Sequence, residues 1–482
     1  MVVSASLRPD ATRNIRRLSL SLTVAALIVG ALTRWLYIIG DVGRIHADEA
    51  VAGLMARSLL DGDWSTFYWG QQYGGTVELL WLSPAMAMFG NSALSVIPAL
   101  EALALCALVW RYCRHFLNNS DAALAASLVW AAPALWQWFS LRPMLFYQPT
   151  LIIGFCVLLL LRPGRPTNNL PLVGLLLGVG WWTSPQILFF AVPALFSARA
   201  TVLRQRGIAK LIAAFCIGAT PWLVTNIATR LASLRSQPPR SGSLLDHFST
   251  QLSTGWPMAF GLRLPFDEQW IWEPLRLLSI AVIALFAAAT VAAWRTHGAA
   301  ISAAIGIIPT FAILQAFAPT GSHVGSGRYY VFVVPSIAIV VIAATSGRSA
   351  RKAGLRAFVV TAMLSLSMLG TLLTKDRRME PTGVADIAAQ LVDAGHTHIR
   401  ADYWSAYLIA WYQPDLVVAA THTDRRPEWA QEVSAAPKVA EVFWLGIDYE
   451  RQRFDELMSS EALIVSSEIS NEWAIVVVEQ QS

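Results

Sequence analysis

Long apolar runs separated by short polar segments dominate the first three quarters of the chain. A membrane-spanning helix needs about 20 mostly apolar residues, and eleven runs are close to that length. They cover approximately residues 18–40, 92–111, 122–140, 146–161, 170–183, 185–198, 209–227, 274–294, 299–318, 329–346 and 355–374. The fifth and sixth runs are short and meet at Trp181–Pro185, which predicts a tight outer turn or a broken helix. The pattern predicts a mainly α, polytopic transmembrane bundle.

The pattern changes after residue 374 to short strand-like runs that alternate with helix-like runs. The strand-like runs cover 397–403, 416–420, 439–445, 463–467 and 473–479, and the helix-like runs cover 385–394, 406–412 and 449–458. Such alternation predicts a small α/β domain. We therefore expect two domains: a transmembrane domain over residues 1–374, with long outer loops at 41–91 and 228–273, and a C-terminal domain over residues 375–482.

Composition supports the membrane assignment. Hydrophobic residues make up 55% of the chain and charged residues 14%, against roughly a quarter charged in soluble domains. This excludes a soluble globular protein, a disordered chain and a disulfide scaffold. The four cysteines lie in or beside apolar runs without a CxxC pair, which is typical of small buried hydrophobic residues. Charge separates the two parts: residues 1–374 carry a net +14 and the remainder a net −9.

Basic residues predict the orientation. Lys and Arg gather on cytoplasmic loops, and placing the N-terminus inside puts most of them there. They are Arg8, Arg13, Arg16, Arg17, Arg111, Arg114, Arg162, Arg165, Arg199, Arg204, Arg206, Lys210, Arg295, Arg348, Arg351, Lys352 and Arg356. The short outer loops then hold only Arg142 and Arg328, and an odd number of spans places the C-terminal domain outside. Acidic residues concentrate on the two long outer loops, where we expect the chemistry.

The first outer loop carries the strongest candidate for chemistry. Asp48 and Glu49 follow the first span, ahead of a helical pattern at 55–62 that Gly62 is expected to end. One interpretation is a helix cap, in which the carboxylate accepts hydrogen bonds from free N–H groups. The other is a reactive carboxylate at the membrane surface, which removes a proton from an acceptor hydroxyl or binds a divalent cation.

Other outer segments add candidate binding groups. Aromatic residues interleaved with Gly and Gln at 67–78 suit a sugar or the head-group layer, and the apolar stretch 77–89 suits the interface. The long loop 228–273 is either a mobile surface loop or a lid or acceptor groove. The Gly-rich segment 319–330, which includes Arg328, is either an anion site or an interfacial anchor.

Three segments together resemble the GT-C superfamily of polytopic glycosyltransferases, which use polyprenyl-phosphate sugars. The likeness is to the branch of protein O-mannosyltransferases and aminoarabinose transferases of lipid A. The segments are Asp48-Glu49 followed by Gly70–Glu78, then Gly180–Pro185, and then Arg328-Tyr329-Tyr330 with Pro335. The tail with Tyr403-Trp404-Ser405-Ala406-Tyr407 is similar to tails of bacterial members. No second outer motif of the mannosyltransferase type is present, so the acceptor stays open.

The resemblance implies roles at matching positions. Asp48 corresponds to the acid of the first outer loop, a catalytic base or metal ligand, and Glu49 is its motif partner. Glu78 corresponds to a metal or substrate contact, and Arg328 with Tyr329 to the segment near the lipid phosphate. The remaining candidate substrate-binding residues are His46, Arg57, Gln71 and Tyr73. A divalent metal ion of unknown identity is the implied cofactor, with Asp48 and Glu78 as candidate ligands, and no organic cofactor is expected.

The expected function is transfer of a sugar from a polyprenyl-phosphate donor to a hydroxyl of a glycan, lipid or protein, with inversion at the anomeric carbon. The expected location is the plasma membrane, as a multi-pass protein with its active site on the outer face, in contact with lipid and not with nucleic acid. Two alternatives stay open. One is a transporter or flippase of lipid-linked sugars, although no internal repeat is visible and the spans hold few charges. The other is a polymerase or ligase of surface polysaccharide.

Overall fold

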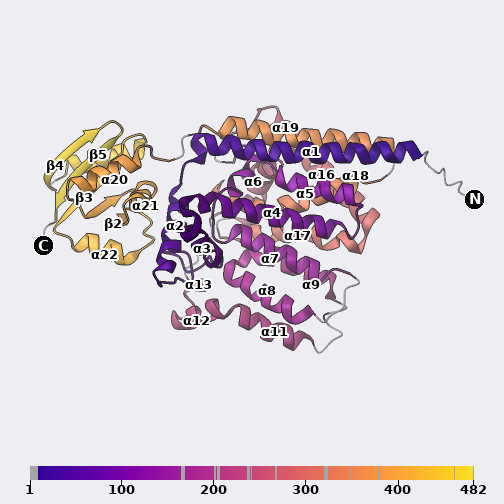
Figure 1. The fold of residues 1–482 in the computed structure, drawn as a ribbon, viewed down its shortest axis with the longest axis horizontal. Helices are drawn as coiled ribbons and strands as arrows, with labels where there is room; N and C mark the ends of the chain where they lie inside the picture. Colours follow the sequence, from indigo (N-terminus) through magenta and orange to yellow (C-terminus); the bar gives the residue numbers. More distant parts are fainter. Residues whose placement is uncertain are drawn as a thin grey trace, which may run out of the picture. The chain divides into compact units, whose positions relative to one another are not determined.

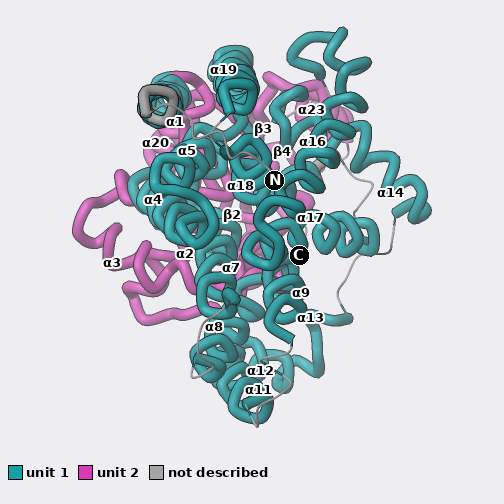
Figure 2. The backbone as a smooth tube through the Cα atoms, turned by 90° about the vertical axis from the view of Figure 1, so that its right-hand side faces the viewer, with its two compact units in different colours: residues 1–39, 95–376 teal, residues 40–94, 377–482 magenta. Residues whose placement is uncertain are grey.

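The computed structural model divides the chain into two compact units. It describes residues 9–163, 169–199, 202, 207–235, 239, 241–265, 269–319, 324–347, 349–377, 380–460 and 462–480. Unit 1 comprises Met1–Ile39 with Ser95–Asp376, and unit 2 comprises Gly40–Leu94 with Arg377–Ser482, as Figure 2 shows in two colours. Unit 2 therefore joins two segments that are far apart in sequence. Of the cations used to predict the orientation, Arg8, Arg165, Arg204, Arg206 and Arg348 lie outside the described residues.

Apart from an isolated β-bridge between Arg263 and Trp270, the regular secondary structure in the described part of unit 1 is helical. Its longer helices are α1 (Pro9–Ile39), most of α4 (Ala93–Cys113), α5 (Asn119–Trp130), α7 (Tyr147–Leu160), α8 (Leu170–Thr183), α9 (Leu188–Ser197), α11 (Gly207–Gly218), α12 (Thr220–Ala228), α16 (Leu275–His297), α17 (Ala299–Phe317), α18 (Val334–Thr345) and α19 (Ala350–Thr374). Shorter pieces are α6 (Ala134–Phe139), η4 (Pro185–Ile187), α13 (Ala232–Arg235), α14 (Leu244–Thr250), η5 (Gln251–Gly255), α15 (Trp256–Ala259) and η6 (Val324–Phe332).

The helices are those of a multi-pass membrane protein. Among the described residues, five helices are long and apolar enough to cross a membrane, or six if the bent pair α11 and α12 forms one span. Each of the eleven predicted runs overlaps a helix, but α7, α8, α9 and α18 are shorter than a full span. The helical membrane bundle is therefore confirmed, whereas the number of eleven spans and the orientation stay predictions.

Close helix packing in unit 1 depends on small residues. A Cβ atom added to Gly174 of α8 would lie 2.1 Å from the Leu211 carbonyl oxygen of α11, and one added to Gly178 would lie 2.1 Å from that of Phe215. In lipid, helices associate through such contacts because burial of apolar surface supplies no driving force. The sequence Gly174–Gly178, with three residues between the glycines, thus brings α8 and α11 into backbone contact.

The described part of loop 228–273 packs on unit 1. His247 of α14 is buried, and its ring nitrogens lie 2.8 Å from the Ala316 carbonyl oxygen of α17 and 2.6 Å from that of Ser241. Arg263 donates to the Ser253 carbonyl at 3.0 Å. Residues 236–238, 240 and 266–268 lie outside the described part, including Arg240, Asp267 and Glu268. A lid or acceptor-groove function for this loop stays a prediction.

Unit 2 contains a five-stranded sheet of order β2-β1-β3-β5-β4. The strands are β1 (His398–Ala401), β2 (Val417–Ala420), β3 (Lys438–Trp444), β4 (Leu463–Ser470) and β5 (Trp473–Glu479), and the helices around them are α20 (Val384–Asp393), α21 (Tyr403–Tyr412), α22 (Pro427–Ala435) and α23 (Asp448–Met458). β1 pairs in parallel with β2 and β3, while β5 is antiparallel to β3 and β4. The predicted small α/β arrangement is confirmed; α22 was not among the predicted helices.

The segment 40–94 completes unit 2. It contains η1 (Asp41–Gly43), α2 (Ala47–Leu60), α3 (Leu79–Phe89) and η2 (Gly90–Ser92). Gly62 follows α2 with φ +90°, as expected for a residue that ends a helix. Helix α2 packs against α21 of the C-terminal segment, where Gly53 faces the Trp411 ring: a Cβ added to Gly53 would lie 2.4 Å from that ring. The two segments therefore form one packed body.

Gly53 gives a direct test of this packing. Replacement by Leu places a side chain where the Trp411 ring lies, so we expect a loss of about 1–3 kcal/mol in the stability of unit 2. The measurement is the rate of trypsin cleavage within residues 377–482 of the full-length protein. A matched control is Gly354→Leu, because no heavy atom lies within 4 Å of a Cβ added there. Equal protection of both variants would contradict the contact between α2 and α21.

Candidate functional site

The first turn of α2 places Asp48 at an end of the helix. His46 is the N-cap residue: its side chain accepts a hydrogen bond from the Asp48 N–H at 3.0 Å, and the Glu49 carboxylate accepts one from the His46 N–H at 3.0 Å. This reciprocal pair is a capping box. The side-chain cap therefore belongs to His46 and Glu49, and the capping interpretation is wrong for Asp48. Its carboxylate is left for another partner.

That partner comes from the C-terminal segment. The Tyr403 hydroxyl at the start of α21 donates a hydrogen bond to Asp48 Oδ1. A guanidinium nitrogen of Arg425 lies 3.9 Å from the same oxygen. The Asp48 side chain is 24% exposed, so the carboxylate keeps access to solvent while a phenol and a cation hold one of its oxygens.

Arg425 lies between two tyrosine rings. Its guanidinium carbon is 5.0 Å from the centre of the Tyr68 ring and 5.1 Å from that of Tyr403, within the range of cation–π attraction. Two of its nitrogens also donate to the Tyr403 hydroxyl at 3.3 Å. Burial by itself lowers the pKa of Arg425, but the adjacent Tyr68, Tyr403 and Asp48 raise it, and the net change is upward. The guanidinium therefore stays charged.

The phenol of Tyr403 stays protonated. Burial raises its pKa first, and the negative charge of Asp48 raises it further, so that the net shift is strongly upward even though Arg425 opposes it. A neutral phenol has a proton to donate, which agrees with the hydrogen bond to Asp48. The same reasoning applies to Tyr407, where burial raises the pKa to about 12.

Backbone contacts fix the position of Arg425. Its N–H donates to the Tyr407 hydroxyl. Gly70 has φ +66°, and a Cβ added there would lie 2.4 Å from the Asp424 carbonyl oxygen and 2.8 Å from the Arg425 Cα. Only glycine permits both this backbone conformation and this approach. The glycine of the Gly70–Glu78 motif thus has a structural reason: it lets the loop and the C-terminal segment meet.

Most other predicted substrate-binding residues also lie in unit 2, but they serve its packing. The His46 ring meets the Trp404 ring at 5.3 Å and lies 3.7 Å from a Glu380 oxygen. The Arg57 guanidinium lies 3.7 Å from the centre of the Trp411 ring and donates to the Trp411 carbonyl at 3.1 Å. Both residues join segment 40–94 to the C-terminal segment, and their role in substrate binding stays a prediction.

The later residues of the motif differ in exposure. Gln71 is partly buried, and its N–H donates to the Tyr68 carbonyl at 3.0 Å. Tyr73 is 40% exposed, whereas Glu78, which precedes α3, is 1% exposed. Tyr73 is thus the accessible side chain of the three, and Glu78 lies inside unit 2.

Arg328 and Tyr329 belong to unit 1. Both lie in η6, where the exposed guanidinium of Arg328 is 5.3 Å from the centre of the Tyr329 ring. Tyr329 in turn stacks on Tyr147 with 6.1 Å between ring centres. Residues 320–323 of the predicted Gly-rich anion site lie outside the described part. The role of Arg328 and Tyr329 at the lipid phosphate stays a prediction.

The side chains at Asp48 do not fit a resident divalent cation. Such ions take several oxygen ligands, whereas Asp48 is in contact with a guanidinium and a phenol. In the part of the chain that the structure describes, no group of three or more His, Cys, Asp or Glu side chains is arranged to hold a metal ion. The metal roles of Asp48 and Glu78 stay predictions, without support from these contacts.

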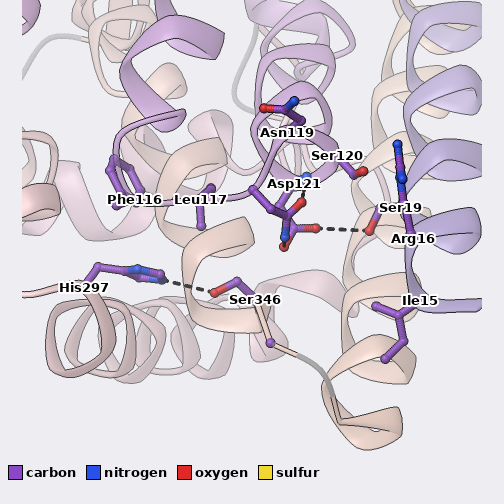
Figure 3. A pocket seen from close by; sticks show the side chains of 12 residues that line it. Ile15, Arg16, Ser19, Phe116, Leu117, Asn119, Ser120, Asp121, His297 and Ser346 are labelled. Carbon is purple, nitrogen blue, oxygen red and sulfur yellow. Dashed lines mark hydrogen bonds between the residues drawn. The ribbon is translucent and has the colours of Figure 1, made fainter. Parts of the chain in front are cut away.

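A cavity of about 530 Å³ lies in unit 1 (Figure 3). Its wall includes Arg16 and Ser19 of α1, Asp121 of α5, and His297, which faces Ser346 at 3.1 Å. All of its lining residues belong to unit 1, whereas Asp48, Tyr403 and Arg425 belong to unit 2.

Tyr68, Tyr403 and Arg425 are the site residues that sequence reasoning missed. Two signals were present: the aromatic sequence Tyr403-Trp404, already noted in the tail, and the basic pair Arg425-Arg426 in a segment that is otherwise acidic. Neither signal indicates a contact with Asp48, because 355 positions separate Asp48 from Tyr403.

Comparison with known proteins identifies the fold. No protein-family model and no curated protein sequence matches the chain. The structure is similar to that of ArnT from Cupriavidus metallidurans bound to undecaprenyl phosphate, with a TM-score of 0.64 and 13% identity over 95% of this chain and 97% of that chain. It is also similar to the archaeal oligosaccharyltransferase AglB from Archaeoglobus fulgidus in complex with an inhibitory peptide and a dolichol-phosphate, with a TM-score of 0.51 and 12% identity over 88% of this chain and 69% of that one.

The archaeal enzyme has also been solved in complex with Zn and sulfate; that structure has a TM-score of 0.51 and 11% identity over 87% of this chain and 67% of that one. ArnT, an aminoarabinose transferase, and AglB are both GT-C glycosyltransferases. The resemblance expected from the sequence is therefore confirmed at the level of the fold.

Proposed function

We propose that this protein, which has the fold of the GT-C glycosyltransferases, transfers a sugar from a polyprenyl-phosphate donor to an acceptor hydroxyl. Asp48 is the proposed general base. The observation that carries the proposal is the setting of Asp48: a partly exposed carboxylate on the first turn of α2, freed from capping by His46 and Glu49. It lies in a chain that is similar over 95% of its length to an aminoarabinose transferase that binds undecaprenyl phosphate.

The chemistry follows from what the transfer needs. The acceptor oxygen forms a bond to the anomeric carbon while the bond from that carbon to the donor phosphate breaks. The proton of the acceptor hydroxyl moves to Asp48, and polyprenyl phosphate leaves with the electron pair. A positioned base contributes typically about 10²–10⁴-fold to the rate of such a step. A single displacement inverts the configuration at the anomeric carbon, and Arg328 is the candidate for the charge of the leaving phosphate.

The apolar helices of unit 1 suit the lipid part of the donor. Large exposed apolar side chains cover α1, α16 and α19, among them Leu277 at 83% and Phe358 at 73% exposed. A polyprenyl chain is apolar like the tails of bilayer lipids, so these side chains suit contact with either. We further propose that the acceptor is a glycan, a lipid or a protein. The proposed place of reaction is the outer face of the plasma membrane.

Mass spectrometry of envelope glycans and lipid-linked sugars, with and without the gene, tests this function. We expect one sugar to disappear from a single acceptor when the gene is absent, while its polyprenyl-phosphate donor accumulates. Re-expression of the wild-type gene should restore both. Unchanged glycans and unchanged donor lipid, with the protein present in the wild-type membrane, would contradict the proposal.

A transporter of lipid-linked sugars is the alternative that the same experiment separates. Such a protein would also cause donor lipid to accumulate when lost, so purified protein in vesicles is needed. Transfer of labelled sugar to an acceptor on the same side as the donor indicates the enzyme. Movement of labelled donor across the vesicle membrane without transfer indicates the transporter. Most acidic residues before position 375 lie on the two long loops 41–91 and 228–273, and few lie within the apolar runs, which favours the enzyme.

A further inference from the structure

We infer that Tyr403 and Arg425, from the C-terminal segment, are positioning residues that orient the Asp48 carboxylate for the transfer step. This inference rests on the proposed function, because it takes Asp48 as the base. It adds that the α/β part of the protein supplies side chains to the active site. The sequence alone assigned that part no chemistry.

The contacts of Asp48 are asymmetric. Oδ1 accepts the Tyr403 hydrogen bond and is the oxygen 3.9 Å from Arg425. Among the described residues, no side chain bonds to Oδ2, and the side chain is 24% exposed. A carboxylate held through one oxygen presents the other in a fixed direction. Oδ2 is therefore the atom that receives the proton of the acceptor hydroxyl.

The protonation states of the two contact groups leave Asp48 as the base. Tyr403 keeps its proton because burial and the charge of Asp48 raise its pKa. Arg425 keeps its charge between the rings of Tyr68 and Tyr403. Neither group competes with Asp48 for the acceptor proton, because one remains neutral and the other remains cationic.

Reaction geometry separates this role from binding of the leaving phosphate. In a single displacement, the attacking oxygen and the leaving oxygen lie on opposite sides of the anomeric carbon. The base contacts the attacking side, and Arg425 lies 3.9 Å from the base. Arg425 therefore acts on the side of Asp48 and the acceptor, and the leaving phosphate needs a different cation.

Hydrogen bonds and a close backbone contact hold the segments that carry both residues. Asp402 caps α21 by accepting a hydrogen bond from the Trp404 N–H at 3.0 Å, which fixes the first turn that carries Tyr403. Arg425 is held by its backbone bond to Tyr407 and by the close approach of Gly70. Fixed supporting groups are what hold a catalytic side chain within a productive geometry. The arrangement is thus more than a surface contact between two segments.

The test uses full-length protein in lipid nanodiscs, with a polyprenyl-phosphate sugar as donor and the acceptor identified by mass spectrometry. Tyr403→Phe removes the hydroxyl alone. We expect kcat to fall about 10- to 100-fold, as for loss of one hydrogen bond to a charged group, with KM for the donor nearly unchanged. Arg425→Met should act in the same direction, and Arg425→Lys, which keeps the charge, should recover part of the rate. Tyr412→Phe, on the exposed side of the same helix, is the matched control.

A double variant distinguishes positioning from a general structural effect. If Tyr403 acts through Asp48, Asp48→Asn combined with Tyr403→Phe should be as slow as Asp48→Asn alone, because interacting residues are not additive. Independent, multiplying losses would overturn the inference. An unchanged kcat in Tyr403→Phe would also overturn the inference. A higher kcat would overturn it too, because it would mean that the hydrogen bond to Asp48 slows the reaction. Trypsin protection of each variant checks that unit 2 remains folded.

The same assay separates failure of the inference from failure of the proposed function. If the wild-type protein transfers sugar and Asp48→Asn does not, a normal rate in Tyr403→Phe defeats positioning alone. If Asp48→Asn transfers at the wild-type rate, the base assignment fails and positioning fails with it. If the wild-type protein transfers no sugar from any polyprenyl-phosphate donor, the proposed function itself is wrong.

Discussion

Asp48→Asn should lower kcat for sugar transfer by about 10²–10⁴-fold, the contribution of a positioned general base. The substitution keeps the shape of the side chain, and the amide oxygen still accepts the Tyr403 hydrogen bond, so the local structure should persist. What it removes is the ability to take up a proton. Because the donor's lipid and phosphate do not depend on that proton, KM for the donor should change little. Single-turnover kinetics with a labelled donor measures the loss.

A matched control separates charge from chemistry. Asp41→Asn removes one negative charge from the same segment, at a carboxylate that pairs with Arg44 at 3.0 Å and is 35% exposed. We expect its rate within about twofold of the wild type, since pairs of exposed charges contribute little. Near-normal transfer by a folded Asp48→Asn protein would remove the base from the mechanism. Equal losses in both variants would point to surface charge instead.

The second large effect is expected in unit 1. Arg356→Met should destabilise the protein by about 3–5 kcal/mol, because it leaves the Asp121 carboxylate buried without its countercharge. The two side chains are 1% and 3% exposed, with 2.5 Å between nitrogen and oxygen. Ser19 also donates to Asp121 at 3.1 Å, and Arg356 donates to the Thr345 carbonyl at 2.8 Å. The pair thus ties α1, α5, α18 and α19 together, and α1 and α19 lie side by side (Figure 1).

Unfolding in a denaturing detergent, followed by tryptophan fluorescence, measures this loss. Arg351→Met is the control, since Arg351 is exposed on the same helix. The double variant Arg356→Met with Asp121→Leu should recover much of the stability, because an apolar pair avoids the desolvation cost of two buried charges. A stability change below about 1 kcal/mol in Arg356→Met would mean that water or another cation compensates Asp121.

Arg356 and Asp48 show what the distribution of charge along the sequence can predict and what it cannot. Arg356 was assigned to an inner loop because Lys and Arg collect there, yet in the fold its side chain is 1% exposed and paired with Asp121. Asp48 was singled out because acidic residues concentrate on the predicted outer loops and because it follows the first apolar run. Charge counts thus located important positions, while the partner of each charge came from a segment more than two hundred positions away.

The sequence by itself determined what local and compositional physics controls. Apolar runs of near-spanning length specify helices in lipid, since only there does a backbone satisfy its own hydrogen bonds. Alternation after residue 374 specified all five strands, and the Asp48-Glu49 motif with Gly70–Glu78 indicated the GT-C fold.

Only the tertiary structure decided which side chains surround Asp48. His46 and Glu49 form the cap, so the Asp48 carboxylate is left for Tyr403 and Arg425. No periodicity or spacing in the sequence encodes these partners of Asp48, because a contact between residues 355 positions apart depends on how whole elements pack. Here that packing brings Gly53 against Trp411 and Gly70 against Arg425.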